Sequence, residues 1–568
     1  MKLVVVGGVT GGASTAARVR RLDAKAEIVM FERGEHVSFS NCALPYYLGG
    51  VVESSDHLLV VTPEDFKRRH DIEVRTRCEV IAINRKSKTV TVKDLTDGRK
   101  YEEPYDKLML APGASPILPK TIAGIESKNV FTVRNVTDII ALKNYAEKSG
   151  VENVVVVGGG FIGVEVAENL CKAGKNVSLI EGTEQIMTPF DYDMVQILHK
   201  EMDDHGVKLY LSSTVTAVNA ESGSVTAVKE GQIFKVPADL VVMAIGVMPE
   251  TKLAEEAGLE IGETHGIKVN HNYQTSDPDI YAVGDAVEIF NKMLHTYGRL
   301  ALAGPAQRQA RAAADHMYGI PHNNTGYIGS SCVRVFHQNA AATGLSEKAA
   351  AKAGYHFDSV LLFPSDKPGS MPDSHYMGFK LVFEVPTGRI LGAQAIGVGA
   401  ADKRIDVIAA MITMNGTLED LKELELCYSP VFGTAKDIVN MAALVALNIL
   451  YGRFTQVHVN QVRPLVESGA YIIDVREADE YNKGHIKGAH NIPLSELREH
   501  LDEIPQDIPV YLHCRSSQRS YYALSALAGR GFHNIVNISG SFLGLSLYEY
   551  FNDKMTGREP IVTAYNFD

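Results

Sequence analysis

The sequence has few cysteines for its length. The 568 residues contain six, too scattered to suggest a disulfide framework or a zinc site. Positive charge is not in excess either, because the net charge is −12 and no long run has one sign. No apolar stretch approaches the ~18 residues of a transmembrane helix. These absences predict a cytoplasmic protein with reduced thiols, without a metal site and without a nucleic-acid or membrane partner.

The composition is that of an ordinary globular protein, with 45% hydrophobic and 22% charged residues. A chain of this length accommodates roughly three or four domains. The segment MKLVVVGG begins like a signal peptide. Its short apolar run ends in glycines, so we expect a buried strand instead.

A glycine-rich turn separates two apolar segments near the beginning of the chain. Leu3 to Val6 precedes the turn GGVTGG, and a helical stretch follows through Arg21. The second segment, EIVMF, leads to Glu32, 20 residues after the last glycine. This spacing places a carboxylate at the ribose of a dinucleotide, although valine replaces the middle glycine of the usual G-x-G-x-x-G. The expected contacts are Gly7, Gly8, Gly11, Gly12 and Glu32.

A second turn, GGGFIG, has all three glycines of this motif. It follows the apolar segment Val154 to Val157, and a helix continues to about Ala173. The next strand leads to Glu181, which would repel a 2′-phosphate, and no arginine follows it closely. We therefore expect NADH here rather than NADPH. The expected contacts are Gly158, Gly160, Phe161, Ile162, Gly163 and Glu181.

Two further segments, LAPGA at residues 110–114 and TSDPDIYAVGDA at 275–286, follow in order. With both glycine turns, the chain resembles the pyridine nucleotide-disulfide oxidoreductases over about residues 1 to 450. The resemblance implies an α/β fold with two Rossmann-like dinucleotide-binding domains, an α+β dimerisation domain, bound FAD and a homodimer. It adds these cofactor contacts: Arg33, Ala111, Pro112, Gly113, Gly246, Gly284, Asp285 and Ala303.

The cysteine pattern places the chain in a single-cysteine branch of that family. Many members carry a C-x4-C pair beside the flavin, but the residue five positions after Cys42 is Tyr47. One thiolate must then form either a sulfenic acid or a mixed disulfide with the substrate. The NADH peroxidases and oxidases carry a histidine where this chain has Thr10. The segment SFSNCALPY instead resembles the motif of the coenzyme A-disulfide and coenzyme A-persulfide reductases.

This resemblance assigns roles to several side chains. Cys42 is the expected redox nucleophile beside the flavin, and Asn41 and Ser38 are expected to contact substrate or polarise its sulfur. The other four cysteines before residue 500 are expected to be structural. Candidate residues for coenzyme A, mainly for its phosphates, are Arg18, Arg21, Ser38, Asn41, Lys67, Arg68, Lys403 and Arg404.

The dimerisation region departs from the family pattern. Two tyrosine-bearing segments there are expected to reach the partner's site as proton or hydrogen-bond donors. In this chain Tyr428 is present, but Phe432 replaces the second tyrosine of its segment, and Ser370 and Met371 replace the other pair. Reduction of coenzyme A disulfide is therefore expected to be less efficient than reduction of a persulfide, whose leaving group is hydrosulfide.

After a helix expected from Ala435 to Leu450, the chain resembles a rhodanese domain. Its segments are YIIDVR, GHI, GAHNIP and the loop CRSSQRS, which follows a strand. A cysteine in such a loop, here Cys514, is expected to hold a persulfide, with Arg519 completing the anion cradle. Many rhodanese loops have glycine at the position of Ser517. The expected domains are FAD-binding (1–112 and 250–325), NADH-binding (113–249), dimerisation (326–452) and α/β rhodanese (455–568).

These features predict an FAD-dependent reductase that uses NADH to reduce persulfides, polysulfides or coenzyme A disulfide. Cys514 would accept sulfane sulfur, coenzyme A could carry it to Cys42, and hydrosulfide would leave. One alternative is an NADH oxidase or peroxidase that cycles through a Cys42 sulfenic acid, which Thr10 argues against. The other is a redox-sensing flavoprotein whose rhodanese domain serves for docking, which the two intact cysteine sites argue against.

Overall fold

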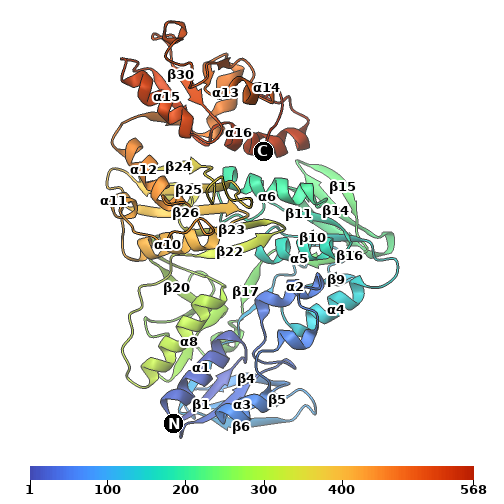
Figure 1. Ribbon diagram of the computed structural model, residues 1–568. Helices are drawn as coiled ribbons and strands as arrows, with labels where there is room; N and C mark the ends of the chain where they lie inside the picture. Colours follow the sequence, from blue (N-terminus) through green and yellow to red (C-terminus); the bar gives the residue numbers. More distant parts are fainter. Residues whose placement is uncertain (568) are drawn as a thin grey trace. The chain divides into compact units, whose positions relative to one another are not determined.

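The computed structural model describes residues 1–567 and divides the chain into two compact units (Figure 1). Unit 1 consists of residues 1–184 and 207–327, and unit 2 of residues 185–206 and the chain from residue 328 onward. Within the described part of the chain, no helix has both the length and the apolar character needed to cross a membrane.

The first sheet of unit 1 is parallel, with the glycine-turn strand β1 at its centre. The strand order is β19 (Ile280–Ala282), β7 (Lys107–Leu110), β1 (Lys2–Val6), β2 (Glu27–Phe31) and β3 (Glu73–Arg75). Their apolar side chains are almost fully buried, as expected for a parallel sheet covered on both faces. Helix α1 (Thr10–Leu22) packs beside α8 (Ala303–Met317), as Figure 1 shows.

The second sheet of unit 1 repeats this arrangement around β10. Its parallel order is β12 (Lys208–Tyr210), β11 (Asn176–Ile180), β10 (Asn153–Val157), β16 (Leu240–Met243) and β9 (Val130–Phe131). Helix α5 (Phe161–Lys172) follows β10 directly and packs on β10 and β11.

Smaller elements complete unit 1. The remaining helices are α2 (Leu44–Leu48), α3 (Pro63–His70), α4 (Val136–Ala146) and α7 (Lys252–Glu256). The antiparallel strands are β4 (Cys78–Asn84), β5 (Thr89–Asp94), β6 (Lys100–Pro104), β13 (Thr214–Asn219), β14 (Ser224–Lys229), β15 (Gln232–Pro237), β8 (Ala114–Pro116) and β17 (Val247–Pro249). A last small sheet contains β18 (Ile267–Lys268), β20 (Val287–Asn291) and β21 (Thr296–Gly298).

Unit 2 begins with an antiparallel sheet covered by helices. The strand order is β22 (Ser331–Val335), β23 (Gln338–Gly344), β26 (Ile390–Gly397), β25 (Met377–Glu384) and β24 (Phe357–Leu362). The helices are α9 (Glu347–Lys352), α10 (Ala401–Thr413), α11 (Leu418–Lys422) and α12 (Ile438–Leu450). Helix α12 begins later than the expected Ala435, because the Asp437 side chain caps it by accepting the Val439 N–H.

The second sheet of unit 2 is parallel. Its order is β27 (Thr455–Val457), β31 (Ile535–Ile538), β30 (Val510–His513), β28 (Tyr471–Asp474) and β29 (His490–Asn491). Its helices are α13 (Val462–Glu467), α14 (Ala478–Asn482), α15 (Gln518–Ala528) and α16 (Ser541–Thr556). The expected fold class is thus confirmed: two dinucleotide-type α/β sheets, an α+β domain and a C-terminal α/β domain.

Helix α6 (Tyr192–Asp204) belongs to unit 2, although the expected NADH-binding domain (113–249) contains it in sequence. It packs along α16, and Asn552 donates a 2.7 Å hydrogen bond to the Tyr192 hydroxyl. Gln456 and Gly540 donate to the backbone of β24 at Ser359 and Leu361. The C-terminal α/β domain is thus joined to the antiparallel domain inside one unit. The sequence-based domain boundaries stay predictions.

Candidate functional site

The two glycine turns have the same local geometry. Gly7 and Gly158 begin them with φ of +94° and +107°. A Cβ on Gly12 would lie 1.8 Å from the Gly7 carbonyl oxygen, and one on Gly163 would lie 1.9 Å from that of Gly158. Only glycine tolerates this approach of helix to strand. Val9 has a φ of −99°, which explains why valine is accepted where the motif usually has glycine.

Each turn is held by the acidic residue that follows the second strand. Glu32 accepts the Gly8 N–H at 2.9 Å, and Glu181 accepts the Gly159 N–H at 2.6 Å. The remaining oxygens accept from Gly34 and Thr183 at 2.8 Å. The carboxylates therefore lie beside the turns, at the position where a dinucleotide ribose binds.

A cavity of ≈ 470 Å³ opens at the carboxyl end of the first sheet. Its size suits a large organic cofactor, and Gly7 and Val9 of the glycine turn line it. Predicted cofactor residues that line it are Gly7, Glu32, Arg33, Ala111, Pro112, Gly113 and Asp285. Gly284 begins the turn that presents Asp285, and Ala303 is the first residue of α8.

The predicted nucleophile Cys42 lies in a 3-10 turn, Asn41–Ala43, directly before α2. Asn41 lines the cavity, and the Cys42 side chain is exposed. The loop is anchored at Ser38, whose φ is +46°, by its N–H to Gly8 and its carbonyl to Val60. The sequence thus brings Cys42 to the glycine turn of the first sheet. No disulfide links the cysteines of the described chain.

Desolvation raises the pKa of the Cys42 thiol, and the charges of Glu165 and Asp285 raise it further. Burial raises the pKa of Glu165 to about 7, while the Tyr46 hydroxyl donates to this carboxyl at 3.0 Å. Burial also raises the pKa of Asp285. Sequence reasoning missed Glu165 and Tyr46. An acid on the otherwise apolar start of α5, FIGVEVA, was the available signal.

The basic residues predicted for coenzyme A are placed differently from one another. Arg18 on α1 is held by Asp315 of α8 at 2.6 Å. Arg21 is exposed at the end of α1. On α3, Lys67 pairs with Asp71 and Arg68 pairs with Asp65, both at the exposed surface. These four cations belong to unit 1, as do Ser38 and Asn41.

The predicted residues of the antiparallel domain divide into exposed and buried groups. Tyr428 and Phe432 are 51% and 77% exposed, and Ser370 is exposed. Lys403 is exposed and pairs with Asp406. Arg404, in contrast, is buried, donating to Asp437 at 3.2 Å and to the Asp366 carbonyl. This geometry favours a structural role for Arg404 rather than a phosphate contact.

The second predicted nucleophile, Cys514, follows β30 and is only 1% exposed. Its N–H donates to the Ser541 hydroxyl at 3.3 Å, and α15 begins four residues later. The first-turn N–H groups of a helix have no partner within the helix, and they favour an anion beside the thiol. Ser517 caps α15 with a φ of +76°, which explains why glycine is common at this position.

Arg519 forms a two-point ion pair with Glu480, at 2.5 and 2.7 Å. This pair fixes the guanidinium in the first turn of α15. The YIIDVR and GHI segments meet in the core of the domain, where buried Arg476 donates to Asp474 and to the Gly484 carbonyl. These motif residues therefore bond to one another in the core of the domain.

Three comparisons bear on this arrangement. Residues 1–310 match the family model described as pyridine nucleotide-disulphide oxidoreductase, residues 330–437 match its dimerisation domain, and residues 458–547 match the rhodanese-like domain. Coenzyme A disulfide reductase of Staphylococcus aureus is 34% identical over 446 residues, covering 78% of this chain and 98% of that protein.

Two solved structures are similar over almost the whole chain. Reduced CoADR-RHD of Bacillus anthracis is 42% identical, with a TM-score of 0.92 and coverage of 97% of this chain and 98% of that one. The NAD-dependent persulfide reductase of A. fulgidus is 34% identical, with a TM-score of 0.90 and coverage of 95% and 99%. Both similarities extend through the C-terminal domain, which the S. aureus relative does not cover.

Proposed function

Because the chain belongs to the pyridine nucleotide-disulphide oxidoreductase family, we propose that it is an NADH-dependent persulfide and polysulfide reductase, coupled to its rhodanese domain. Membership makes it an NAD(P)H-dependent oxidoreductase that uses FAD and a pyridine nucleotide. The observation that carries the proposal is the exposed thiol of Cys42, whose neighbour Asn41 lines the cavity at the first glycine turn. A lone thiol needs its disulfide partner from the substrate.

FAD, when bound, supplies a two-electron relay between the nicotinamide and sulfur. The Cys42 thiolate attacks the carbon-bound sulfur of a persulfide, the S–S bond breaks, and hydrosulfide leaves. Two electrons then cleave the Cys42 mixed disulfide, and the substrate leaves as its thiol. The balance is RSSH + NADH → RSH + HS⁻ + NAD⁺. Asn41, adjacent to the nucleophile and lining the cavity, is proposed to orient the substrate sulfur.

Coenzyme A is the proposed carrier of the sulfur. The S. aureus relative is named for coenzyme A disulfide, and the A. fulgidus neighbour for a persulfide. Arg18, Arg21, Lys67 and Arg68 are the candidate phosphate contacts, and Arg18 would exchange its ion pair with Asp315 for a phosphate. Because Phe432, Ser370 and Met371 lack hydroxyphenyl groups, coenzyme A disulfide should be the slower substrate.

Cys514 is proposed to accept sulfane sulfur and hold it as a persulfide among the loop amides. Glu181 is proposed to favour NADH, because its carboxylate would repel a 2′-phosphate. The working form is proposed to be a cytoplasmic homodimer, in which Tyr428 assists the partner's site; its 51% exposure leaves it accessible.

The test is anaerobic NADH turnover with coenzyme A persulfide, polysulfide, coenzyme A disulfide and peroxide. We expect hydrosulfide from the sulfane substrates, and loss of activity in Cys42→Ser. Cys514→Ser should lose turnover only with sulfur donors that must first load the rhodanese loop. If peroxide were the only good acceptor, the proposal would be wrong and Cys42 would act through a sulfenic acid.

A further inference from the structure

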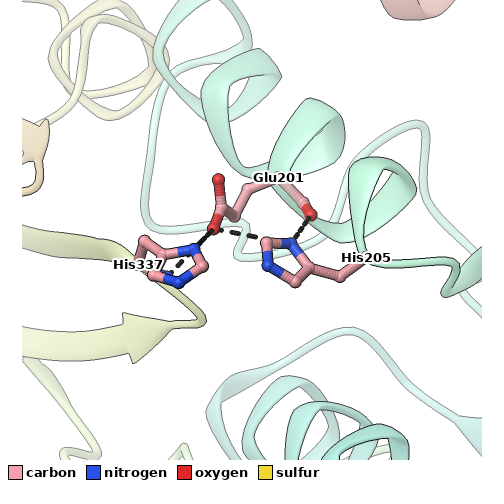
Figure 2. Close-up of side chains that lie close together, drawn as sticks. All are labelled: Glu201, His205 and His337. Atoms are coloured by element: carbon pink, nitrogen blue, oxygen red, sulfur yellow. Dashed lines mark hydrogen bonds and ion pairs between the residues drawn. The ribbon is translucent and has the colours of Figure 1, made fainter.

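Two histidines and a glutamate of unit 2 lie close together at the end of α6 (Figure 2). Glu201 and His205 are one helical turn apart, and His337 lies in the tight turn between β22 and β23. One ligand atom from each residue lies within 4.8 Å of the others. Figure 2 shows the Glu201 carboxylate between the two imidazole rings.

The carboxylate is positioned before any ligand binds. Glu201 Oε1 accepts the backbone N–H of His337 at 2.9 Å, and lies 3.2 Å from His337 Nδ1 and 3.6 Å from His205 Nδ1. Its side chain is only 11% exposed. A carboxylate held at this depth is costly unless cationic or coordinating groups compensate it.

The His205 ring is also fixed in orientation. Its Nδ1–H donates to the Glu201 carbonyl oxygen at 2.8 Å, so Nε2 carries the lone pair. The ring stacks on Phe336 with centroids 4.0 Å apart and planes 8° apart. A backbone carbonyl that fixes the tautomer of a histidine is typical of metal-binding imidazoles. His337, in contrast, is 70% exposed, which leaves one side of the cluster open to water.

From this geometry we propose that Glu201, His205 and His337 bind a zinc ion, with water completing the coordination. Two imidazole nitrogens and one carboxylate oxygen suit Zn²⁺, whereas Ca²⁺ and Mg²⁺ prefer oxygen ligands alone. Zinc bonds of about 2.0–2.2 Å in tetrahedral geometry separate ligand atoms by about 3.3–3.5 Å. The distance of 3.2 Å between Glu201 Oε1 and His337 Nδ1 is already close to this spacing.

The bound ion would join α6 to the β22–β23 turn. Helix α6 also packs on α16, so the same helix contacts both domains of unit 2. The ion would therefore hold these elements together, and its site is separate from the redox chemistry proposed above.

The test is zinc titration of the flavin-loaded, metal-stripped protein against a fluorescent zinc competitor. His337→Ala, in an exposed turn, should weaken the proposed site about 100-fold, which removes one tight equivalent relative to the wild type. NADH turnover should be unchanged.

His533→Ala is the matched control, since His533 is an exposed histidine of the same unit outside the cluster. It should keep the wild-type stoichiometry and affinity. Glu201→Gln keeps the size of the side chain and should weaken the site as His337→Ala does. Equal zinc binding by the wild type and both cluster variants would overturn the proposal and assign the zinc to the thiols.

Discussion

The charge of Glu165 opposes the ionisation of the Cys42 thiol. Because the pKa of Glu165 is about 7, its carboxyl is mostly neutral well below that pH and charged above it. Glu165→Gln removes the charge at every pH, so the Cys42 pKa should fall, although desolvation continues to raise it. The rate of iodoacetamide labelling of Cys42 against pH measures this change.

The sign of the effect distinguishes this explanation from a general disturbance. Wild type and Glu165→Gln should label alike where the carboxyl is protonated, and diverge above pH 7, with the variant faster. Glu256→Gln, on the exposed face of α7, should follow the wild type throughout. Equal profiles for wild type and Glu165→Gln would show that desolvation alone determines the Cys42 pKa.

The raised pKa of Glu165 also makes the free energy of unfolding depend on pH. A carboxyl whose pKa is raised on folding contributes stability below its unfolded pKa, and this contribution is lost as the pH rises through about 7. The free energy of unfolding of Glu165→Gln should therefore fall less between pH 5 and pH 7 than that of the wild type. Urea unfolding at both values measures the difference.

The sequence predicted the site residues well where one short segment contains both the reactive side chain and the backbone turn that positions it. The segment SFSNCALPY predicted Cys42 as the nucleophile, and in the structure the preceding residue, Asn41, lines the predicted cofactor cavity. Ion pairs between residues that are distant in the sequence could not be predicted from short segments. Arg404 was predicted to contact a phosphate because the sequence alone does not show its ion pair with Asp437, which forms only in the folded chain. Glu165 was missed because its burial comes from neighbouring elements.

Two glycines at the start of α5 differ in their surroundings: Gly163 packs closely against the backbone, whereas Gly160 faces open space. A methyl group on Gly163 would meet the Gly158 carbonyl oxygen at 1.9 Å, whereas one on Gly160 would meet nothing within 4 Å. Gly163→Ala should therefore cost about 3 kcal/mol of stability, since neither backbone segment can easily move. Thermal unfolding of the flavin-loaded protein measures this loss.

Gly160→Ala is the matched substitution. It should fold with wild-type stability and raise the KM for NADH, because the new methyl group lies where the pyrophosphate approaches the turn. A Gly163→Ala protein of wild-type stability would contradict the close packing of α5 on β10. An unchanged KM in Gly160→Ala would place the dinucleotide elsewhere.

The motif spacing also predicted the order of the elements well. Strand, glycine turn, helix and acid recur around β1 and β10, since the period of apolar residues and the glycines are local signals. The sequence did not predict that α6 belongs to unit 2. Its apolar face packs against α16, about 350 residues later in the chain, and sequence periodicity does not identify such a partner.

The rhodanese domain is packed into unit 2 rather than tethered to it. Gly544 of α16 lies so close to Phe363 that a Cβ would be 2.9 Å from its ring. A chain ending at Gly452 should keep its flavin but unfold at a lower temperature, by about 2–4 °C for each kcal/mol lost. Scanning calorimetry and binding of an apolar dye measure the exposed surface.

Gly544→Leu, which inserts a side chain at the same contact, should lower the unfolding temperature in the full-length protein. Gly557→Ala lies at the end of α16, where a Cβ meets nothing within 4 Å, although its φ is +66°. Its loss should be smaller than that of Gly544→Leu. Equal unfolding temperatures for the shortened and full chains would indicate that the domains fold without mutual support.

The two predicted sulfur nucleophiles differ sharply in accessibility, since Cys42 is exposed and Cys514 is 1% exposed. Bulky electrophiles in a cell or a purification buffer would therefore modify Cys42 before Cys514. A sulfur atom stored on Cys514 would be shielded from the same reagents by its own loop. Alkylation of Cys42 should thus stop the proposed reduction while leaving a persulfide on Cys514 intact. The protein would lose the transfer of electrons to sulfur but keep the sulfur that it had bound.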